Sequence, residues 1–190
     1  MLYKNIPSII QSHDPVRISP EGCHEAAVAM LLCELDRTPK MFFIQRALHE
    51  NDPWSGQIAF PGGSRDPEDP DTLHTAQRET VEEVGICLEN IPLLGQLDDQ
   101  KSFIKINSRP VVINCYVFEV PETILPENSE EVHDSFWVPV HHLASPENKT
   151  THQVSQSGES RPAISLDDGQ VLWGLTYRFV NMLLEKISLN

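Results

Sequence analysis

The stretch Phe60–Ile86, FPGGSRDPEDPDTLHTAQRETVEEVGI, carries the strongest structural signal in the chain. It joins a Gly-Gly turn, an acidic connector with two prolines, and a run rich in glutamate. Asp69 can accept the N–H groups of a first helical turn, and Pro70 fits the first helical position. Gly85 enters the left-handed conformation at little cost and so ends helices. We therefore expect a helix over residues 70–84.

The charged and apolar residues of this helix fall on separate faces. Glu79, Glu82 and Glu83 are three or four positions apart, so their carboxylates share one face. Another face, able to pack on a core, carries Leu73, Ala76, Thr80 and Val84. A charge run is usually a solvated surface. Here, however, no lysine neutralises the glutamates, Arg78 lies four residues before Glu82, and a Gly-Gly turn precedes the helix. These features indicate an oxygen-ligand site for a hard divalent cation.

This segment resembles the signature of the Nudix hydrolases, in which a glycine and a spaced acidic residue precede Arg-Glu-x-x-Glu-Glu-x-Gly and an aliphatic residue. The matching residues are Gly63, Arg78, Glu79, Glu82, Glu83, Gly85 and Ile86. Asp69 stands in place of the family's upstream glutamate, or Glu68 does with shifted spacing, and one extra residue precedes Arg78. The resemblance implies an α/β class fold, an α/β/α sandwich around a mixed β-sheet.

The resemblance also implies roles for individual residues. Mg²⁺ or Mn²⁺ would be bound by Glu79, Glu82 and Glu83 with the Gly63 backbone, and Arg78 would brace the glutamates. The general base is either one of these glutamates or a glutamate from a later loop. For the later loop the candidates are Glu131 and Glu130, and exposed surface charge is an equal alternative for both. The implied reaction is hydrolysis of a phosphoric anhydride by water.

Flanking segments are similar to the coenzyme A pyrophosphatase branch of that family, whose members release phosphopantetheine and adenosine bisphosphate. The similar segments are Arg46-Ala47, GQIAFPGG at 56–63, Glu131-Val132, FWVP at 136–139 and WGLT at 173–176. Asn51 replaces the branch's second arginine. Arg46, Arg65 or Lys101 could therefore bind substrate phosphate, together with the backbone of Gly62 and Gly63. Coenzyme A or an acyl-coenzyme A is the expected substrate. ADP-ribose, dinucleotides or a catalytically silent ligand sensor are the alternatives.

Composition limits the other classes of function. At 190 residues and 39% hydrophobic content, we expect one domain over residues 23–190, with an N-terminal extension, residues 1–22, packed on it. A net charge of −14 disfavours nucleic acid, whereas a bound metal permits a small phosphorylated substrate. The four cysteines form no CxxC pair and are typical of free thiols. With no signal peptide and no membrane span in the sequence, we expect a cytoplasmic monomer or homodimer.

The pattern of apolar residues predicts the remaining elements. The expected strands are residues 25–35, 41–45, 57–60, 91–97, 110–120 and 136–138. A turn over Asp36–Pro39 should join the first two into a hairpin. The expected helices are residues 6–10, 141–144 and 171–187. Three polar segments are interpreted as connections: residues 98–109 at the mouth of a pocket, residues 121–132, and a mobile loop over residues 145–162.

Overall fold

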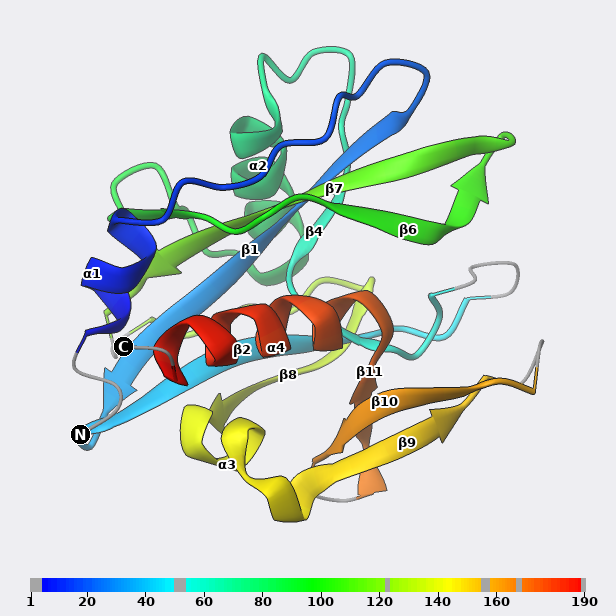
Figure 1. Ribbon diagram of the computed structural model, residues 1–190. Helices are drawn as coiled ribbons and strands as arrows, with labels where there is room; N and C mark the ends of the chain where they lie inside the picture. The colour runs from blue at the N-terminus through cyan, green and yellow to red at the C-terminus, as the bar shows by residue number, and fades with distance from the viewer. Residues whose placement is uncertain (1–4, 50–53, 122–123, 155–157, 167–168, 189–190) are drawn as a thin grey trace.

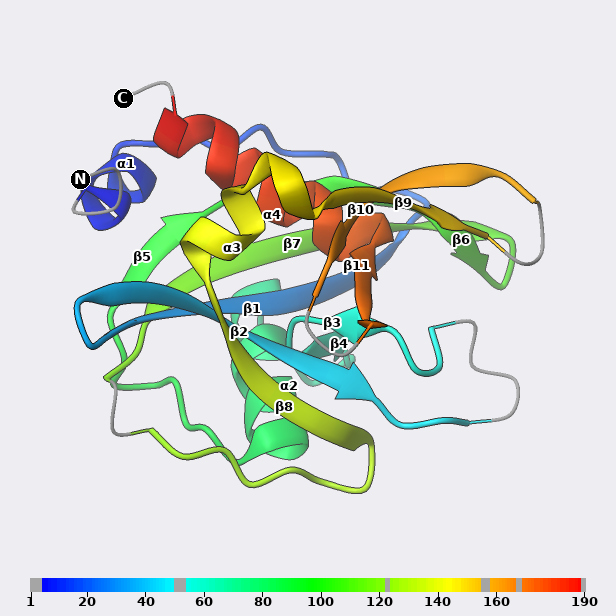
Figure 2. The same ribbon diagram turned by 90° about the horizontal axis from the view of Figure 1, so that it is seen from below.

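The computed structural model describes residues 5–49, 54–121, 124–154, 158–166 and 169–188, which leaves Asn51 outside the described residues. Within them, a mixed sheet lies between helices on its two faces (Figure 1), and the view from below separates the layers (Figure 2). The helices are α1 (Ile6–Gln11), α2 (Thr72–Val84), α3 (Val140–Ala144), α4 (Gly174–Ser188) and the 3₁₀ turn η1 (Pro146–Asn148). This arrangement confirms the predicted α/β/α sandwich.

The main sheet has a mixed strand order that places a short glycine strand beside its centre. In the described residues it has eight strands: β3-β2-β1-β7-β5 in order, with β4 paired to β1, β6 to β7 and β8 to β2. Strands β1 and β7 run parallel, and the other pairs are antiparallel. The bounds are β1 His24–Leu35, β2 Thr38–Arg46, β3 Ile58–Ala59, β4 Gly62–Ser64, β5 Leu93–Gln96, β6 Gln100–Ile106, β7 Arg109–Glu119 and β8 Val132–Pro139.

The predicted hairpin of β1 and β2 forms through a two-residue turn. Asp36 and Arg37 both have positive φ, 52° and 61°, as the primed hairpin turns require. Leu35 pairs with Thr38, and Pro39 lies inside β2 opposite Glu34. The turn is therefore shorter than the Asp36–Pro39 segment expected from the proline.

Each face of the sheet buries its own hydrophobic cluster. One cluster, which includes Leu31 and Phe42, packs under Ala76 and Val84 of α2. The other includes Met30 and Phe43 and packs under Phe179 and Leu183 of α4. Ile6 and Ile10 of α1 also belong to this second cluster. Among the described residues, no helix is long and apolar enough to cross a membrane.

The interpretation of residues 98–109 as a polar connector is wrong, because most of this segment forms β6 and pairs with β7. Asn107 and Ser108 make the turn, with φ values of 47° and 66°. Asp98 and Asp99 do not line a pocket mouth. They accept backbone N–H groups of the N-terminal arm, from Val16 at 2.9 Å and Ile18 at 2.8 Å. Non-local pairing therefore orders a polar segment here.

A second sheet replaces the loop expected over residues 145–162. Strands β9 (Lys149–Gln153), β10 (Ser160–Ser165) and β11 (Val171–Trp173) form it, in the order β11-β10-β9. Residues 155–157 lie outside the described parts. The C-terminal helix accordingly begins at Gly174 rather than residue 171. One face of this small sheet meets the core through Ile164 and Leu172, which suffices to order polar strands.

Candidate active site

Helix α2, which carries the glutamates, ends where predicted but starts two residues later. Asp71 is the N-cap, and its side chain accepts the His74 N–H at 2.8 Å. Gly85 ends the helix with φ 69°. The prediction that Asp69 caps the helix is wrong, because its carboxylate points instead to Arg78.

Asp69 and Arg78 form an ion pair on the inner side of the site. The Asp69 side chain is 3% exposed and accepts from Arg78 Nε at 3.1 Å and Nη2 at 3.0 Å. The Thr75 hydroxyl donates to the same carboxylate at 2.8 Å. The hydrogen bond from Arg78 is the main reason that the pKa of Asp69 lies far below its usual value, although burial opposes it. Asp69 is therefore a fixed anion that orients Arg78.

Arg78, held by Asp69, also contacts two of the three glutamates. Its Nη1 donates to Glu82 at 2.8 Å, the contact expected from their i,i+4 spacing, and its Nη2 lies 3.0 Å from Glu79. Nη2 also donates to the Ser64 carbonyl of β4 at 3.2 Å. Arg78 thus ties the acidic face of α2 to the neighbouring glycine strand.

The three glutamates lie in different environments. Glu82 is 56% exposed, Glu79 is 16% exposed, and Glu83 is 3% exposed. One oxygen of Glu83 accepts the Gly62 N–H at 2.8 Å, and the other lies 3.5 Å from Arg46. The buried glutamate therefore faces the Gly-Gly turn, and the exposed one faces solvent.

The two glycines of β4 are required by close packing. At Gly62, φ is 152° and a Cβ would lie 2.2 Å from the Ala27 carbonyl oxygen of β1. At Gly63, a Cβ would lie 2.5 Å from the Glu79 carboxylate. The Gly-Gly pair thus lets the strand lie beside β1 while the Glu79 carboxylate lies directly against its backbone.

Burial raises the pKa of both inner glutamates. For Glu83, burial raises the pKa to about 8, against the lowering effect of the Gly62 N–H and Arg46. For Glu79, burial also raises the pKa, and Arg78 opposes it. Repulsion between the two glutamates, and from Glu131, adds to the shift of Glu83. Both inner glutamates therefore hold their protons more tightly than an exposed glutamate does.

Glu131 approaches this cluster on the loop before β8. The loop is fixed by backbone bonds at both sides: Ser129 N–H donates to the Glu83 carbonyl at 2.9 Å, and Ala47 N–H donates to the Glu131 carbonyl at 2.8 Å. Glu131 is exposed, and its charge acts on Glu79 and Glu83. Glu130 is also exposed. The structure thus places Glu131 and Arg46 near the glutamates of α2.

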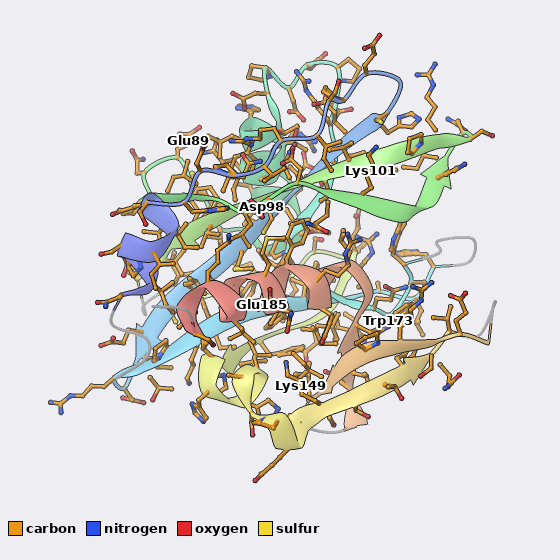
Figure 3. The ribbon with its side chains drawn as sticks, in the orientation of Figure 1. Glu89, Asp98, Lys101, Lys149, Trp173 and Glu185 are labelled. Atoms are coloured by element: carbon orange, nitrogen blue, oxygen red, sulfur yellow. The ribbon has the colours of Figure 1, made fainter. Side chains whose placement is uncertain are left out.

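Arg65, which was expected to bind substrate, points elsewhere. Its guanidinium donates to Glu25 at 2.6 Å and to the carbonyls of Asp69 and Pro70 at 3.1 and 2.9 Å. These contacts hold the connector before α2, so the geometry does not support a phosphate-binding role. Lys101 lies on β6, beyond β1 and β7 from the glycine strand (Figure 3).

The donor set fits a hard divalent cation by its chemistry. Carboxylate oxygens on successive turns, beside a glycine backbone, are the ligands that Mg²⁺ and Mn²⁺ prefer. Burial, with a smaller contribution from repulsion between carboxylates, raises the pKa values of the inner glutamates, and a bound cation would favour their charged forms. Across the described part of the chain, no three His, Cys, Asp or Glu side chains are already grouped around a common point. Instead, the carboxylates of α2 form ion pairs with Arg46 and Arg78.

Two residues of this arrangement were not assigned roles from the sequence. Ser129 fixes the Glu131 loop through its backbone N–H, and no side-chain pattern reveals such a contact. Glu25 holds Arg65 across β1 and β4. The contact between Asp69 and Arg78 could have been anticipated, because Asp69 stands where the family motif has a glutamate.

Comparisons with known proteins agree with the fold and motif. A family model described as NUDIX domain matches residues 24–156. The human protein named mitochondrial coenzyme A diphosphatase NUDT8 is 32% identical over 157 residues, which cover 80% of this chain and 64% of that protein. Yersinia enterocolitica NudL, named an uncharacterized Nudix hydrolase, is 29% identical over 182 residues, covering 95% and 89% of the two chains.

A solved structure extends the likeness to almost the whole fold. The MutT/nudix family protein from Enterococcus faecalis aligns with a TM-score of 0.61 at 18% identity, covering 94% of this chain and 66% of that one. The chain belongs to the Nudix hydrolase family, whose members hydrolyse phosphoric anhydrides. It spans 64% of the length of the human relative.

Proposed function

We propose that this protein is a divalent-metal-dependent pyrophosphohydrolase that cleaves the P–O–P linkage of a nucleoside diphosphate derivative. The observation that supports this most directly is the convergence of Glu79 and Glu83 on Gly63 and Gly62. Coenzyme A or an acyl-coenzyme A is the first candidate substrate. It is supported by the flanking segments of the sequence and by 32% identity to a protein named a coenzyme A diphosphatase.

The roles proposed for the residues follow from their positions. Glu79, Glu82, Glu83 and the Gly63 backbone would hold Mg²⁺ or Mn²⁺, which when bound polarises phosphoryl oxygens and acidifies water. Arg78, anchored by Asp69, orients Glu79 and Glu82. Arg46 supplies a cation for substrate phosphate. Glu131, exposed and close enough to act on both inner glutamates, is the candidate for accepting the proton of the attacking water.

Product analysis tests the proposal. The purified protein with Mg²⁺ or Mn²⁺ is incubated with coenzyme A, acetyl-coenzyme A, ADP-ribose, NADH and a dinucleoside polyphosphate. Adenosine bisphosphate with phosphopantetheine, or with its acetyl derivative, is the expected product pair. Preferential cleavage of another compound would change the substrate but keep the reaction. Metal binding without turnover of any compound would favour the ligand-sensing alternative.

The substitution Glu82→Gln separates an enzyme from a binding module. Turnover should fall by orders of magnitude because a metal ligand is lost. The thermal midpoint without metal should stay within a few degrees of wild type, because Glu82 is exposed and its pair with Arg78 contributes roughly 0–1 kcal/mol. Differential scanning fluorimetry and steady-state kinetics measure both quantities. A large loss of stability in the metal-free protein would contradict the proposed site.

The cytoplasm as compartment, the monomeric or homodimeric state and the exclusion of nucleic-acid partners stay predictions. All four cysteines are free thiols in the structure, as the sequence predicts.

A further inference from the structure

The connector between β4 and α2, residues 65–71, contains no helix or strand of its own, and the Arg65 side chain closes it into a loop. Arg65 Nε and Nη2 donate to the Asp69 carbonyl at 3.3 and 3.1 Å, and Nη2 also donates to the Pro70 carbonyl at 2.9 Å. Arg65 therefore fixes the backbone of the residues that lead directly into α2.

Glu25 of β1 holds the Arg65 guanidinium in place. Arg65 Nη1 donates to Glu25 Oε2 at 2.6 Å, and the Arg65 backbone N–H donates to the Glu25 carbonyl at 2.9 Å. All three guanidinium nitrogens of Arg65 are thus engaged, in a planar fork that lysine cannot reproduce. The connector is in this way attached to β1, a strand inside the main sheet.

Asp69 lies between two arginines that hold different parts of it. Arg65 holds its carbonyl, whereas Arg78 contacts its carboxylate at 3.0 and 3.1 Å. Arg78 in turn contacts Glu79 at 3.0 Å and Glu82 at 2.8 Å. A continuous chain of contacts therefore runs from β1 to two of the proposed metal ligands. A shift of the Asp69 backbone would move the guanidinium that orients both.

The ion pair of Arg65 with Glu25 is partly exposed, which limits what it contributes to stability. The side chains of Arg65 and Glu25 are 31% and 26% exposed, and ion pairs near the surface contribute little to the free energy of unfolding. Within the described part of the chain, the printed contacts of Arg65 include no glutamate of α2. Its effect on the site is therefore transmitted through Asp69.

We propose that Arg65, held by Glu25, is a positioning residue for the metal site: it fixes the Asp69 backbone so that Arg78 orients Glu79 and Glu82 before the cation binds. This inference rests on the proposed metal-dependent function and extends it. It replaces the role in phosphate binding expected for Arg65 with one in which Arg65 contacts neither metal nor substrate. Residues that hold metal ligands in place contribute to metal affinity although they do not touch the ion.

Titration of Mn²⁺ without substrate tests this role. Affinity is measured by isothermal calorimetry and by electron paramagnetic resonance of the unbound ion, at a temperature where each variant is folded. Arg65→Gln should bind Mn²⁺ about tenfold more weakly than wild type, the lower end of the range for residues that support metal ligands. Removing a positive charge near carboxylates would by itself strengthen cation binding, so weaker binding reports lost geometry. The thermal midpoint without metal should fall only slightly.

Three further variants separate geometry from charge. Arg37→Gln is the matched control: it removes the same charge from the exposed turn between β1 and β2 and should leave Mn²⁺ affinity unchanged. Arg65→Lys keeps the charge beside Glu25 and should fold, but one ammonium group cannot also hold the two carbonyls, so its affinity should fall as well. In Glu25→Gln/Arg65→Gln, affinity should be no lower than in Arg65→Gln, because Glu25 acts only through Arg65.

The outcomes distinguish the positioning role from the proposed function. Wild-type or tighter Mn²⁺ binding by Arg65→Gln overturns the positioning role and leaves the metal-dependent hydrolase in place; if Arg65→Gln does not fold, Arg65→Lys decides in the same way. An equal loss of affinity in Arg37→Gln also overturns it, because the effect is then not specific to the connector. Absence of Mn²⁺ binding by the wild-type protein in the millimolar range overturns the metal site and the proposed function together.

Discussion

At the scale of single residues, the site depends on which of two neighbouring aspartates faces inward. Asp69 is buried and holds Arg78, whereas Asp71 is exposed and caps α2. Both are acidic residues just before the helix, so local chemistry alone makes either one an acceptable cap. The partner nine residues later decides, because only Asp69 lies within reach of the Arg78 guanidinium.

This difference predicts opposite results for the same substitution at two positions. Asp69→Asn should destabilise the protein by roughly 2–4 kcal/mol, because it removes the buried negative charge that Arg78 Nε and Nη2 contact. Asp71→Asn is the control and should change stability little, because Asn caps helices as well as Asp. Urea unfolding at pH 7 measures both. Equal losses of stability in the two variants would show that the Asp69–Arg78 pair does not contribute more than the Asp71 helix cap.

The stability difference between wild type and Asp69→Asn should also depend on pH. The pKa of Asp69 is far below its ordinary value of 3.8, so its stabilising effect is fully present above pH 3.8. The effect is lost as pH falls toward the folded-state pKa, because the unfolded chain takes up the proton first. Urea unfolding between pH 7 and pH 2.5 should show a constant difference above about pH 5 that shrinks below pH 4.

At the scale of elements, β4 packs against β1 and α2, and its two glycines differ in how well they tolerate an added side chain. The added Cβ meets rigid backbone at Gly62 but a flexible carboxylate at Gly63. The same methyl group should therefore unfold the strand at one position and disturb only the site at the next.

Gly63→Ala should fold with a loss of about 1 kcal/mol or less, while displacing the Glu79 carboxylate and weakening Mn²⁺ binding and turnover. Gly62→Ala should cost several kcal/mol, because φ 152° and a backbone clash both oppose it. Thermal unfolding and Mn²⁺ titration separate the two effects. Wild-type metal affinity in Gly63→Ala would remove Glu79 from the ligand set.

At the scale of the whole molecule, Asp98, labelled in Figure 3, links the N-terminal arm to helix α4. The carboxylate accepts from His13 Nε2 at 2.8 Å and from Val16 N–H at 2.9 Å, and Lys186 of α4 lies 3.2 Å from His13 Nδ1. The two ring nitrogens of His13 thus face different partners, Asp98 at Nε2 and Lys186 at Nδ1.

Asp98→Asn should therefore loosen the N-terminal arm without unfolding the domain. The expected loss is about 1 kcal/mol, because Asn still accepts from Val16 but no longer pairs with the charges around it. Amide hydrogen exchange should accelerate at Val16 and Ile18 while the amides of β1 and β7 keep their protection. Asp14→Asn, an exposed residue of the same arm, is the control. Equal acceleration in both variants would contradict the role of Asp98.

Elements whose signals are local could be predicted from the amino-acid sequence. The end of α2 at Gly85, the β1–β2 hairpin, the apolar strand β7 and the family motif were all predicted, because helix stops, turn residues and buried runs act over a few neighbouring positions. It also placed Glu79, Glu82 and Glu83 on one helix face, since helical periodicity alone sets their spacing.

Features that depend on partners far apart in the chain could not be predicted and are seen only in the folded protein. Parts of the polar segments 98–109 and 145–162 became strands, because β6 pairs with β7 and because β9 and β10 pair with each other and β10 pairs with β11. Asp69 binds Arg78 instead of capping α2, and Arg65 pairs with Glu25. The meeting of Arg46 with Glu83 likewise needed the end of β2 to come within reach of α2. Such contacts join residues far apart in the chain, and no local pattern encodes which of several suitable partners the fold brings within reach.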